Sequence, residues 1–516
     1  MSLSKPYNVV LNRWQKNAEE EIMHDIAAIA AIKRGQIVNY QQRSGAFIPG
    51  PPGTGKSFFI DYIVKRIRKE YPELVIHVAA STGAAAARLQ DAMTLATWLS
   101  VGSESMKLDK FDCILDSIKK NCPDRLKECD ILIGDEMSMV SQRQFENLNR
   151  ICQVVRKNPI EFGGIYPIFT GDPFQLPPIP HDNGYGLGRM KTEFVPSCLE
   201  RQYPGYYYIT PDELMRAAEC PVLQNILMQL ISNDSNQRTD AVKVLNEKTC
   251  QGEMSIIDAL ELQQENGSTI LCTSKENELS VEHYNQRAVE GFGDDLKEIT
   301  IKAPLQLHDS SSIDIITRGL GIKNVHAEET EIKSRNTWPP DNKLIIGVPY
   351  MIRANKETLE KVKVYNGMMC QVISYNTNDS TAQVHIYKTK QIVTISHHEF
   401  RSEWIPQIGY SALPLIRASA MTVHKSQGAT LDSIIFEHRR MYVNENHEYV
   451  PHMLYTAFSR VKKINDIRIT DILAPHIIQS KSVQAKLDMI WKLPYMKDYL
   501  KPNQLPSFPQ DRPKWI

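Results

Sequence analysis

The chain has 516 residues, 42% of them hydrophobic and 23% charged, which is the composition of a globular protein with roughly three or four domains. Lys plus Arg and Asp plus Glu both number 60, so bulk charge gives no argument for nucleic-acid binding. The sequence has no apolar run long enough for a membrane span, no secretory signal and no C-x-x-C pair among its nine cysteines. We therefore expect a zinc-free intracellular protein without a membrane partner, in either cytoplasm or nucleus.

The first predicted element is a helix from Leu11 to Arg34. Its apolar residues recur at helical spacing, Asn12 is a candidate N-cap, and Gly35 ends the pattern. Gln15 lies early in this helix. Its amide can read an adenine edge, or it is an ordinary solvated side chain.

The clearest motif follows a short apolar run at 45–48. Gly50-Pro51-Pro52-Gly53-Thr54-Gly55-Lys56-Ser57 fits G-x-x-x-x-G-K-[ST], a loop whose backbone N–H groups cradle phosphates. Lys56 would reach the β- and γ-phosphates, and the Ser57 hydroxyl would hold Mg²⁺. Apolar residues at helical spacing after Ser57 predict the helix that such a loop requires. The motif therefore predicts ATP and Mg²⁺ binding.

Residues 74–80 predict a buried strand, followed by a small polar loop that contains Thr82. This loop is either a ligand site or a helix cap. Further on, Trp98 either stacks on a base or belongs to a core.

Residues 130–136 predict a second strand that ends in two carboxylates. Asp135 would hold Mg²⁺ and Glu136 would act as general base on the attacking water. Gly134 is unusual inside a buried strand.

The stretch from Phe169 to Pro178 predicts a strand followed by a turn, in which Gln175 would sense the γ-phosphate. Pro167 indicates that this strand starts late or lies at an edge.

Residues 183–255, at the start of the second half, show little periodicity and no clear motif. Residues 269–274 predict a strand and 276–288 a helix, which would open a second α/β unit. Short β-like runs then fill 330–410 and indicate a small β-barrel. The α/β pattern returns at 412–436. Five prolines mark the tail after residue 493, which we expect to be extended or a docking arm.

Taken together, the motifs resemble superfamily 1 helicases and, within them, the Pif/RecD-like 5′-to-3′ DNA helicases of superfamily 1B. The phosphate loop is generic, whereas Asp-Glu-x-Ser-Met-Val followed by Gly-Asp-x-x-Gln-Leu-Pro-Pro is far more specific. The matching pieces are Gln15 and residues 50–57, 81–83, 93–95, 135–140, 162–164, 171–178, 365–367, 423–431 and 457–460.

The resemblance implies an α/β fold of two RecA-like domains with parallel sheets, ATP between them, and an inserted SH3-like β-barrel. We expect the first domain, with a short wedge insertion, at 1–195 and the second at 196–329 and 411–480. The barrel would occupy 330–410 and the proline-rich tail 481–516. The expected activity is ATP-driven 5′-to-3′ translocation by a monomeric motor on single-stranded and tailed duplex DNA.

The resemblance also assigns roles to individual residues. Arg460 would act as an arginine finger on the γ-phosphate, and Gln427 and Gly428 would contact the nucleotide. Single-stranded DNA would be contacted by a set of residues that carry polar, basic or aromatic side chains: Thr82, Thr94, Trp98, Phe174, Thr422, His424 and Lys425.

The chain departs from the family pattern in two places. Ala96 and Thr97 replace a histidine and a serine, which alters an expected DNA contact. The family's γ-phosphate arginine at the start of the second domain has no counterpart between residues 223 and 237. Arg216, Arg238 or Arg201 takes its place, or one arginine contact is missing.

Two other readings remain open: a nucleic-acid-stimulated P-loop ATPase that acts as a clamp without unwinding, and an RNA helicase of the same superfamily. A small-molecule kinase would need neither Gln175 nor Arg460.

Overall fold

A computed structural model describes the chain apart from the following residues: 1–9, 40–42, 87–88, 100–110, 122, 178–205, 212–213, 275–278, 292–296, 302–304, 308–341, 354–355, 365–367, 388, 402–407, 440–449, 494–495, 497–498 and 500–516. The chain divides into two compact units. Unit 1 comprises Met1–Leu95, Lys107–Asn233 and Gln484–Ile516, and unit 2 comprises Ala96–Met106 and Asp234–Val483.

Unit 1 is built on a six-stranded parallel sheet in the order β3-β2-β4-β5-β1-β6. Its strands are β1 (Gly45–Pro49), β2 (Ile76–Ala80), β3 (Ala92–Thr94), β4 (Ile131–Asp135), β5 (Tyr166–Gly171) and β6 (Tyr206–Tyr208). Of the two alternatives drawn from Pro167, the edge position is wrong, because β5 pairs with both β4 and β1. Pro167 is the second residue of β5, so its missing N–H falls where the ladder begins.

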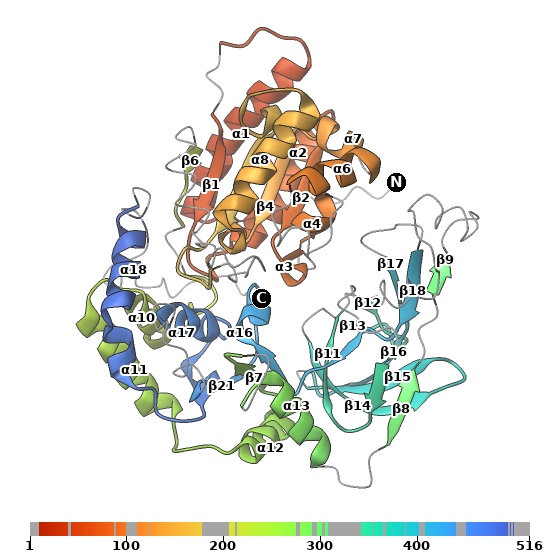
Figure 1. Cartoon of the computed structure of the whole chain (residues 1–516), viewed down its shortest axis with the longest axis vertical. Coiled ribbons are helices and arrows are strands. Elements are labelled where there is room, and N and C mark those ends of the chain that lie inside the picture. The colour runs from red at the N-terminus through yellow and green to blue at the C-terminus, as the bar shows by residue number, and fades with distance from the viewer. Residues whose placement is uncertain are drawn as a thin grey trace. The chain divides into compact units, whose positions relative to one another are not determined.

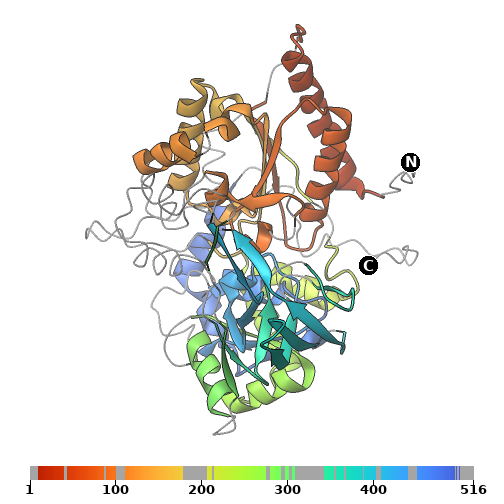
Figure 2. The same ribbon diagram turned by 90° about the vertical axis from the view of Figure 1, so that its right-hand side faces the viewer.

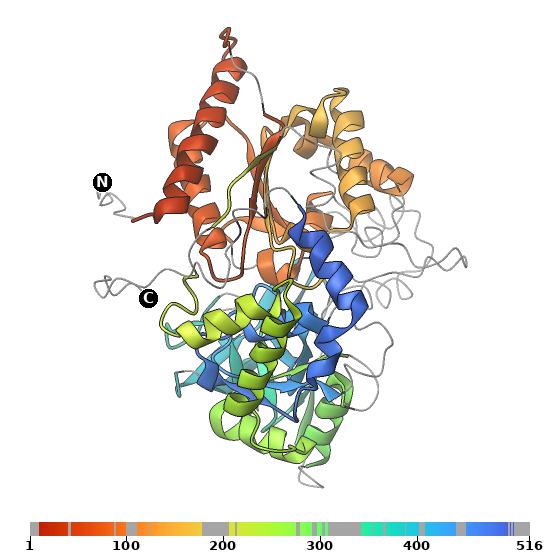
Figure 3. The same cartoon turned by 90° about the vertical axis from the view of Figure 1, so that its left-hand side faces the viewer.

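Helices cover both faces of this sheet. Figures 2 and 3 show α1 (Arg13–Lys33) and α2 (Lys56–Glu70) on one face and α8 (Gln142–Arg156) on the other. The first face is sealed by Trp14, Ile22 and Phe59 against strand residues such as Ile48 and Ile133. The remaining helices of this unit are α3 (Gly83–Ala86), α6 (Phe111–Asn121), α7 (Pro123–Glu128) and α10 (Pro221–Leu230), while α4 (Leu95–Trp98) groups with unit 2 from Ala96 on.

Local sequence accounts well for the start and end of α1. Asn12 caps the helix by accepting from Gln15 N, the Gln15 side chain accepts from Asn12 N, and Gly35 follows with a φ of 77°. This reciprocal capping box satisfies two of the N–H groups that a helix start leaves unpaired. The predicted cap and stop are confirmed.

Unit 2 contains a four-stranded parallel sheet in the order β20-β7-β21-β22. Its strands are β7 (Thr269–Cys272), β20 (Ala420–Thr422), β21 (Ile434–Glu437) and β22 (Ile467–Ile469). Its helices are α11 (Ser235–Thr249), α12 (Ile256–Asn266), α13 (Val281–Glu290), α16 (Val423–Ser426) and α17 (Val450–Phe458), and α18 (Lys481–Trp491) follows them. The two parallel sheets confirm the predicted α/β class, and Figure 1 labels the helices named here together with β7 and β21.

Antiparallel strands lie between β7 and β20 in sequence. Five of them form one sheet in the order β16-β15-β14-β11-β19 around buried residues that include Tyr350, Val372 and Val384. They are β11 (Pro349–Ile352), β14 (Met369–Asn376), β15 (Thr381–Ile386), β16 (Ile392–Ser396) and β19 (Leu415–Arg417). The SH3-like character of this region stays a prediction.

Shorter antiparallel pairings flank that sheet. They join β8 (Glu298–Ile301) to β10 (Asn342–Ile345), β12 (Lys356–Glu357) to β13 (Lys363–Val364), and β18 (Ile408–Ala412) to β17 (His398–Arg401) and β9 (Leu305–Leu307). Antiparallel pairing therefore extends from Glu298 to Arg417, beyond the predicted 330–410 on both sides.

The expected domain boundaries differ from this division in three further places. Ala96–Met106, expected in the first domain, groups with unit 2. The segment 196–233, expected in the second domain, falls in unit 1, where β6 adds to the sheet beside β1. Residues from Gln484 onward also group with unit 1, and α18 occupies the start of the predicted tail. Among the described helices, none combines the length and apolar character needed to cross a bilayer.

Candidate nucleotide-binding site

The predicted phosphate loop connects the end of β1 to the start of α2. Gly53 and Gly55 have φ values of 81° and 89°, a left-handed conformation that glycine adopts without a steric cost. The Thr54 hydroxyl donates to Pro51 O at 3.0 Å and braces the turn. Strand, loop and helix thus follow one another as the motif predicts, and α2 begins at Lys56.

Lys56 is folded onto its own loop. Its Nζ donates to Gly50 O at 2.7 Å and to Pro51 O at 2.8 Å. Burial lowers the pKa of Lys56, while the carboxylates of Asp172, Glu136 and Asp135 oppose the shift and Arg216 adds to it. The three carboxylates and the lysine therefore lie within electrostatic range of one another.

Asp135, the last residue of β4, accepts hydrogen bonds from both the start of α2 and β5. Its Oδ2 accepts from Ser57 Oγ at 3.1 Å, and its Oδ1 accepts from Thr170 Oγ1 at 2.5 Å. A carboxylate beside a hydroxyl is a donor set of hard oxygens that suits Mg²⁺. The arrangement fits a magnesium ion held by Ser57 and Asp135.

Glu136 follows Asp135 in a left-handed conformation, with φ 54° and ψ 37°. Such a conformation costs a non-glycine residue about 1–3 kcal/mol and is common at functional sites. Ser81 Oγ donates to Glu136 O at 2.8 Å and helps to hold it. The left-handed conformation turns the chain away from β4 at Glu136, the residue predicted to be the general base.

Gly134 is explained by close packing. A Cβ at this position would lie 2.7 Å from Phe169 Cδ1 and 2.9 Å from Met137 Sδ. Any side chain at 134 would therefore displace β5 or the turn that follows Glu136.

The turn after β5 is organised around Asp172. The Asp172 carboxylate accepts from Phe174 N at 3.0 Å, and Asp172 O accepts from Gln175 N at 3.2 Å. Gln175 is buried at the same sheet edge as the phosphate loop. Phe174, expected at the DNA, is fully buried in this structure against Trp491 and Tyr499. Its DNA contact stays a prediction that needs this packing to open.

Residues 214–216 lie directly against the phosphate loop. The sequence patterns did not indicate this contact. Met215 N and Arg216 N donate to Gly53 O at 2.7 and 2.9 Å, and a Cβ on Gly53 would come within 2.5 Å of Arg216 Cβ. Gln224 Nε2 braces the segment by donating to Leu214 O at 3.2 Å. Gly50 is equally crowded, because its Cβ would lie 2.7 Å from Pro211.

This contact distinguishes two of the three arginines that could replace the missing one. Arg216 lies beside the loop, whereas Arg238 is buried in unit 2 with its Nε donating to Ile478 O at 3.0 Å. Arg201 lies outside the described residues.

Gln15 approaches the loop from α1. Its Nε2 donates to Gly55 O at 3.4 Å, while its Oε1 serves the capping box. Gln15 is therefore buried at the loop rather than solvated, and both ends of its amide have protein partners. Its role as an adenine reader stays a prediction.

Thr82 and Thr94 lie at the same edge of the unit 1 sheet as the loop. Both follow or end strands that run parallel to β4, whose carboxyl end carries Asp135. Thr82 Oγ1 accepts from Ala85 N at 3.2 Å and so caps α3. Trp98 is fully buried, which agrees with the core alternative.

The predicted residues of unit 2 surround the short helix α16. Thr422 ends β20 and caps α16 by accepting from Lys425 N at 3.4 Å; Lys425 itself is exposed. Burial lowers the pKa of His424 to about 4. Gln427 is 1% exposed, and neither polar atom of its amide has a hydrogen-bond partner among the described residues. Such a group is the kind that a ligand satisfies, and Gly428 follows it with a φ of 83°.

Arg460, predicted to be an arginine finger, is fully buried. Its guanidinium donates to Thr456 O at 2.8 Å, Ser459 Oγ at 2.7 Å and Ser426 O at 3.4 Å. These bonds join the predicted finger to the loop that carries Gln427. A phosphate contact would have to exchange some of them.

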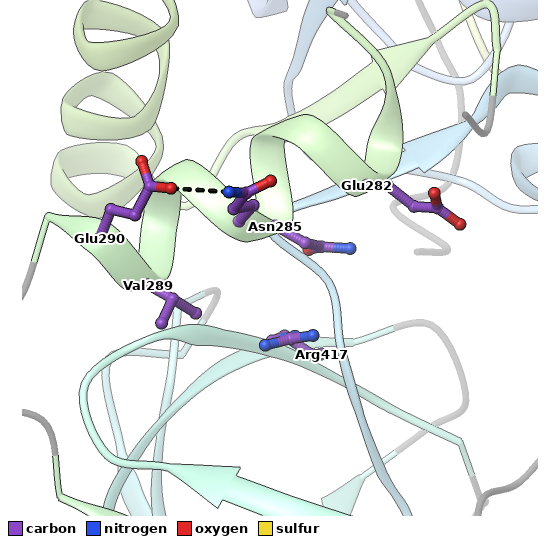
Figure 4. A pocket seen from close by; sticks show the side chains of 6 residues that line it. Glu282, Asn285, Val289, Glu290 and Arg417 are labelled. Atoms are coloured by element: carbon purple, nitrogen blue, oxygen red, sulfur yellow. Dashed lines mark hydrogen bonds between the residues drawn. The ribbon is translucent and has the colours of Figure 1, made fainter. Parts of the chain in front are cut away.

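A separate pocket opens on unit 2 beside α13 (Figure 4). It is lined by Glu282, Asn285, Gln286, Val289, Glu290 and Arg417. Gln286 Nε2 donates to Glu290 Oε1 at 2.8 Å, and Asn285 Oδ1 accepts from Ser419 N at 3.2 Å. The pocket contains none of the residues that the motifs predicted.

Comparison with known proteins agrees with this geometry. Residues 18–197 match the model of the PIF1-like helicase family. The chain is 23% identical over 438 residues to the ATP-dependent DNA helicase PIF1 of Xenopus laevis, covering 82% of this chain and 58% of the relative. It is 25% identical over 495 residues to the helicase of the same name from Psychrobacter sp. strain PRwf-1, covering 87% and 67%.

The fold also matches a solved structure. The crystal structure of the PIF1 helicase from Candida albicans superimposes with a TM-score of 0.66 at 19% identity, covering 94% of this chain and all of that one. At this identity the likeness concerns the fold. The chain spans little more than half the length of the Xenopus relative and about a quarter of the Saccharomyces cerevisiae DNA helicase RRM3 that it matches.

Proposed function

We propose that the chain is a member of the PIF1-like helicase family and an ATP-dependent DNA helicase that moves 5′ to 3′ on single-stranded DNA. The observation that carries the ATPase part is the constellation around the phosphate loop. Lys56, Ser57, Asp135 and Glu136 come together at the carboxyl ends of β1 and β4, where parallel sheets bind ligands.

Four residues of unit 1 would each have a role in ATP hydrolysis. The Lys56 ammonium, now held by Gly50 O and Pro51 O, would turn to the β- and γ-phosphates of bound ATP. Ser57 and Asp135 would hold Mg²⁺, which supplies charge neutralisation at the phosphates when bound. Glu136 would accept a proton from the attacking water.

Two further side chains would recognise the γ-phosphate from this unit. Gln175 is presented by the turn that Asp172 organises. Arg216 takes the place of the arginine that sequence motifs left unassigned, because its backbone is bonded to Gly53 O. A guanidinium that neutralises the charge developing on the transferred phosphoryl group is worth roughly 10³-fold or more in turnover. Arg460, Gln427 and Gly428 would complete the site from unit 2.

Movement on DNA would follow from the nucleotide cycle. The threonines at the edge of the first sheet, with Thr422, His424 and Lys425 of unit 2, would contact single-stranded DNA. Because burial lowers the pKa of His424, its imidazole would act as a neutral hydrogen-bonding group at pH 7, while Lys425 would supply the positive charge. A cycle of ATP binding and hydrolysis would then alter these contacts in turn.

The test compares three duplexes of one sequence, with a 5′ tail, a 3′ tail and no tail. We expect ATP-dependent unwinding of the 5′-tailed duplex only, and ATPase activity stimulated by single-stranded DNA. DNA binding should weaken as salt rises, because phosphate contacts release counterions. Stimulated ATPase without unwinding of any duplex would indicate the clamp alternative. Preferential stimulation by RNA would indicate an RNA helicase, and better unwinding from a 3′ tail would refute the polarity.

A further inference from the structure

The turn that presents Gln175 is held from outside by the C-terminal part of unit 1. Tyr499 OH donates to Asp172 Oδ1 at 2.8 Å, and 327 residues separate the two in sequence. The same Oδ1 accepts from Phe174 N at 3.0 Å. Both partners, Asp172 and Tyr499, are fully buried. A buried carboxylate depends on such donors, because few others can replace the water that it has lost.

The Tyr499 ring is itself locked in place. Its centroid lies 5.3 Å from that of Phe174 and 6.0 Å from that of Trp491, both in edge-to-face arrangements. Phe174 and Trp491 lie 5.1 Å apart, and Trp491 Nε1 donates to Ile231 O at 2.7 Å. These three rings, which we call the aromatic clasp, join the turn after β5 to the end of α18.

The clasp holds Asp172, which interacts with two residues of the proposed ATP site. Asp172 is the strongest of the three carboxylates that favour the charged form of Lys56. Asp172 O also accepts from Gln175 N at 3.2 Å and so closes the turn on the predicted γ-phosphate sensor. A shift of the Asp172 carboxylate would thus disturb both Lys56 and Gln175.

We propose that Tyr499 is a positioning residue for ATP hydrolysis, whose hydroxyl holds Asp172 so that the turn after β5 presents Gln175 to the γ-phosphate. This inference rests on the proposed ATPase function of the site. It gives Tyr499 a role in the nucleotide cycle, whereas the extended or docking arm expected after residue 493 stays a prediction, because most of that segment lies outside the described residues.

Tyr499→Phe in the full chain is the direct test, because it removes one hydroxyl and keeps the clasp. Tyr284→Phe is the matched control: Tyr284 OH donates to the buried carboxylate of Glu437 at 2.9 Å in unit 2. Both variants lose a buried tyrosine–carboxylate bond, so we expect similar falls in unfolding temperature. We expect only Tyr499→Phe to lower kcat, by roughly tenfold or more.

A nucleotide-affinity comparison separates positioning from general damage. Tyr499→Phe should weaken binding of a non-hydrolysable ATP analogue relative to ADP, because ADP lacks the γ-phosphate that Gln175 would contact. In an Asp172→Ala background, which removes the acceptor of the Tyr499 hydroxyl, the same substitution should change kcat by less than about twofold, since both act through one contact. Equal effects of the two tyrosine variants on kcat, a parallel loss of ADP and analogue affinity, or full additivity with Asp172→Ala would overturn the proposal.

These outcomes remain distinct from failure of the proposed function. A wild-type chain that hydrolyses ATP but unwinds no duplex would refute the helicase and leave the positioning test intact. A wild-type chain without ATPase activity would refute the proposed function, and the affinity comparison would still decide the role of Tyr499.

Discussion

The hydroxyl of Ser57 donates a hydrogen bond to Oδ2 of Asp135 at 3.1 Å. This bond joins the first turn of α2 to the carboxyl end of β4, a strand separated from β1 in the sheet by β5. It brings the proposed phosphate and magnesium ligands into one place, and the following predictions concern their neighbourhood.

Lys56→Ala should abolish ATP hydrolysis and leave the fold intact. The ammonium is buried and bonded to two carbonyls of its own loop, and its loss removes a proposed phosphate contact while the apolar residues that anchor α2 in the core stay in place. Steady-state ATPase activity and thermal unfolding measure the two parts. Lys69→Ala, an exposed lysine at the other end of α2, is the control and should keep full turnover. Near-normal turnover of the Lys56 variant would refute the site assignment.

Glu136→Gln should retain nucleotide binding and lose hydrolysis by about 10²–10⁴-fold, because only the general base is removed. The amide has the size of the carboxylate and can adopt the same left-handed backbone conformation. Equilibrium binding of an ATP analogue, measured beside turnover, decides the matter. Loss of both together would point to a structural or metal-binding role for Glu136.

Arg216→Ala should lower kcat by on the order of 10³-fold, whereas ADP affinity should change little. The backbone bonds from Met215 and Arg216 to Gly53 O do not depend on the side chain, so the loop should keep its shape. Arg287→Ala removes an exposed arginine that pairs with Glu290 on α13, and it serves as the control. If both variants keep wild-type kcat, the γ-phosphate arginine lies elsewhere.

Gly134→Ala should destabilise unit 1 by about 1–3 kcal/mol, the usual cost of overpacking a well-packed core. The new methyl group would meet Phe169 and Met137 at distances below 3 Å. Gly291→Ala is the matched control, because its Cβ would meet nothing closer than 3.6 Å. Denaturant unfolding of both variants measures the difference, and equal stabilities would contradict the packing explanation.

The free energy of unfolding should decrease as the pH is lowered, in part because of His424. Its folded-state pKa, about 4, lies below the ordinary value of 6.5, so the unfolded chain takes up the proton first. The wild type should therefore lose stability relative to His424→Gln as pH falls from about 7 towards 4, with no difference in trend above pH 7. Paired unfolding curves without DNA measure this. A difference that stays constant with pH would show that His424 titrates normally.

Much of the site could be predicted because its motifs are local. The glycines at 53 and 55, the lysine and the serine must occur at fixed spacing for one turn to wrap a phosphate, and the cap at Asn12 involves residues three positions apart. Alternating or continuous apolar runs likewise predicted the strands that end in Asp135 and Gly171. For such features the sequence by itself determined the conformation and predicted the chemistry.

Other features depend on which distant segments meet, and only the tertiary structure decided them. Pro167 left a late start or an edge position open, and strand order placed β5 between β4 and β1. Among the candidate arginines, only the tertiary structure brought the backbone of Arg216 to Gly53 O, while Arg201 lies outside the described residues. The sequence connected neither Phe174 nor Tyr499 with the other, and only the tertiary structure packed them together beside Asp172. Local propensity carries no information on such pairings, because they arise from burial of surfaces that lie hundreds of residues apart.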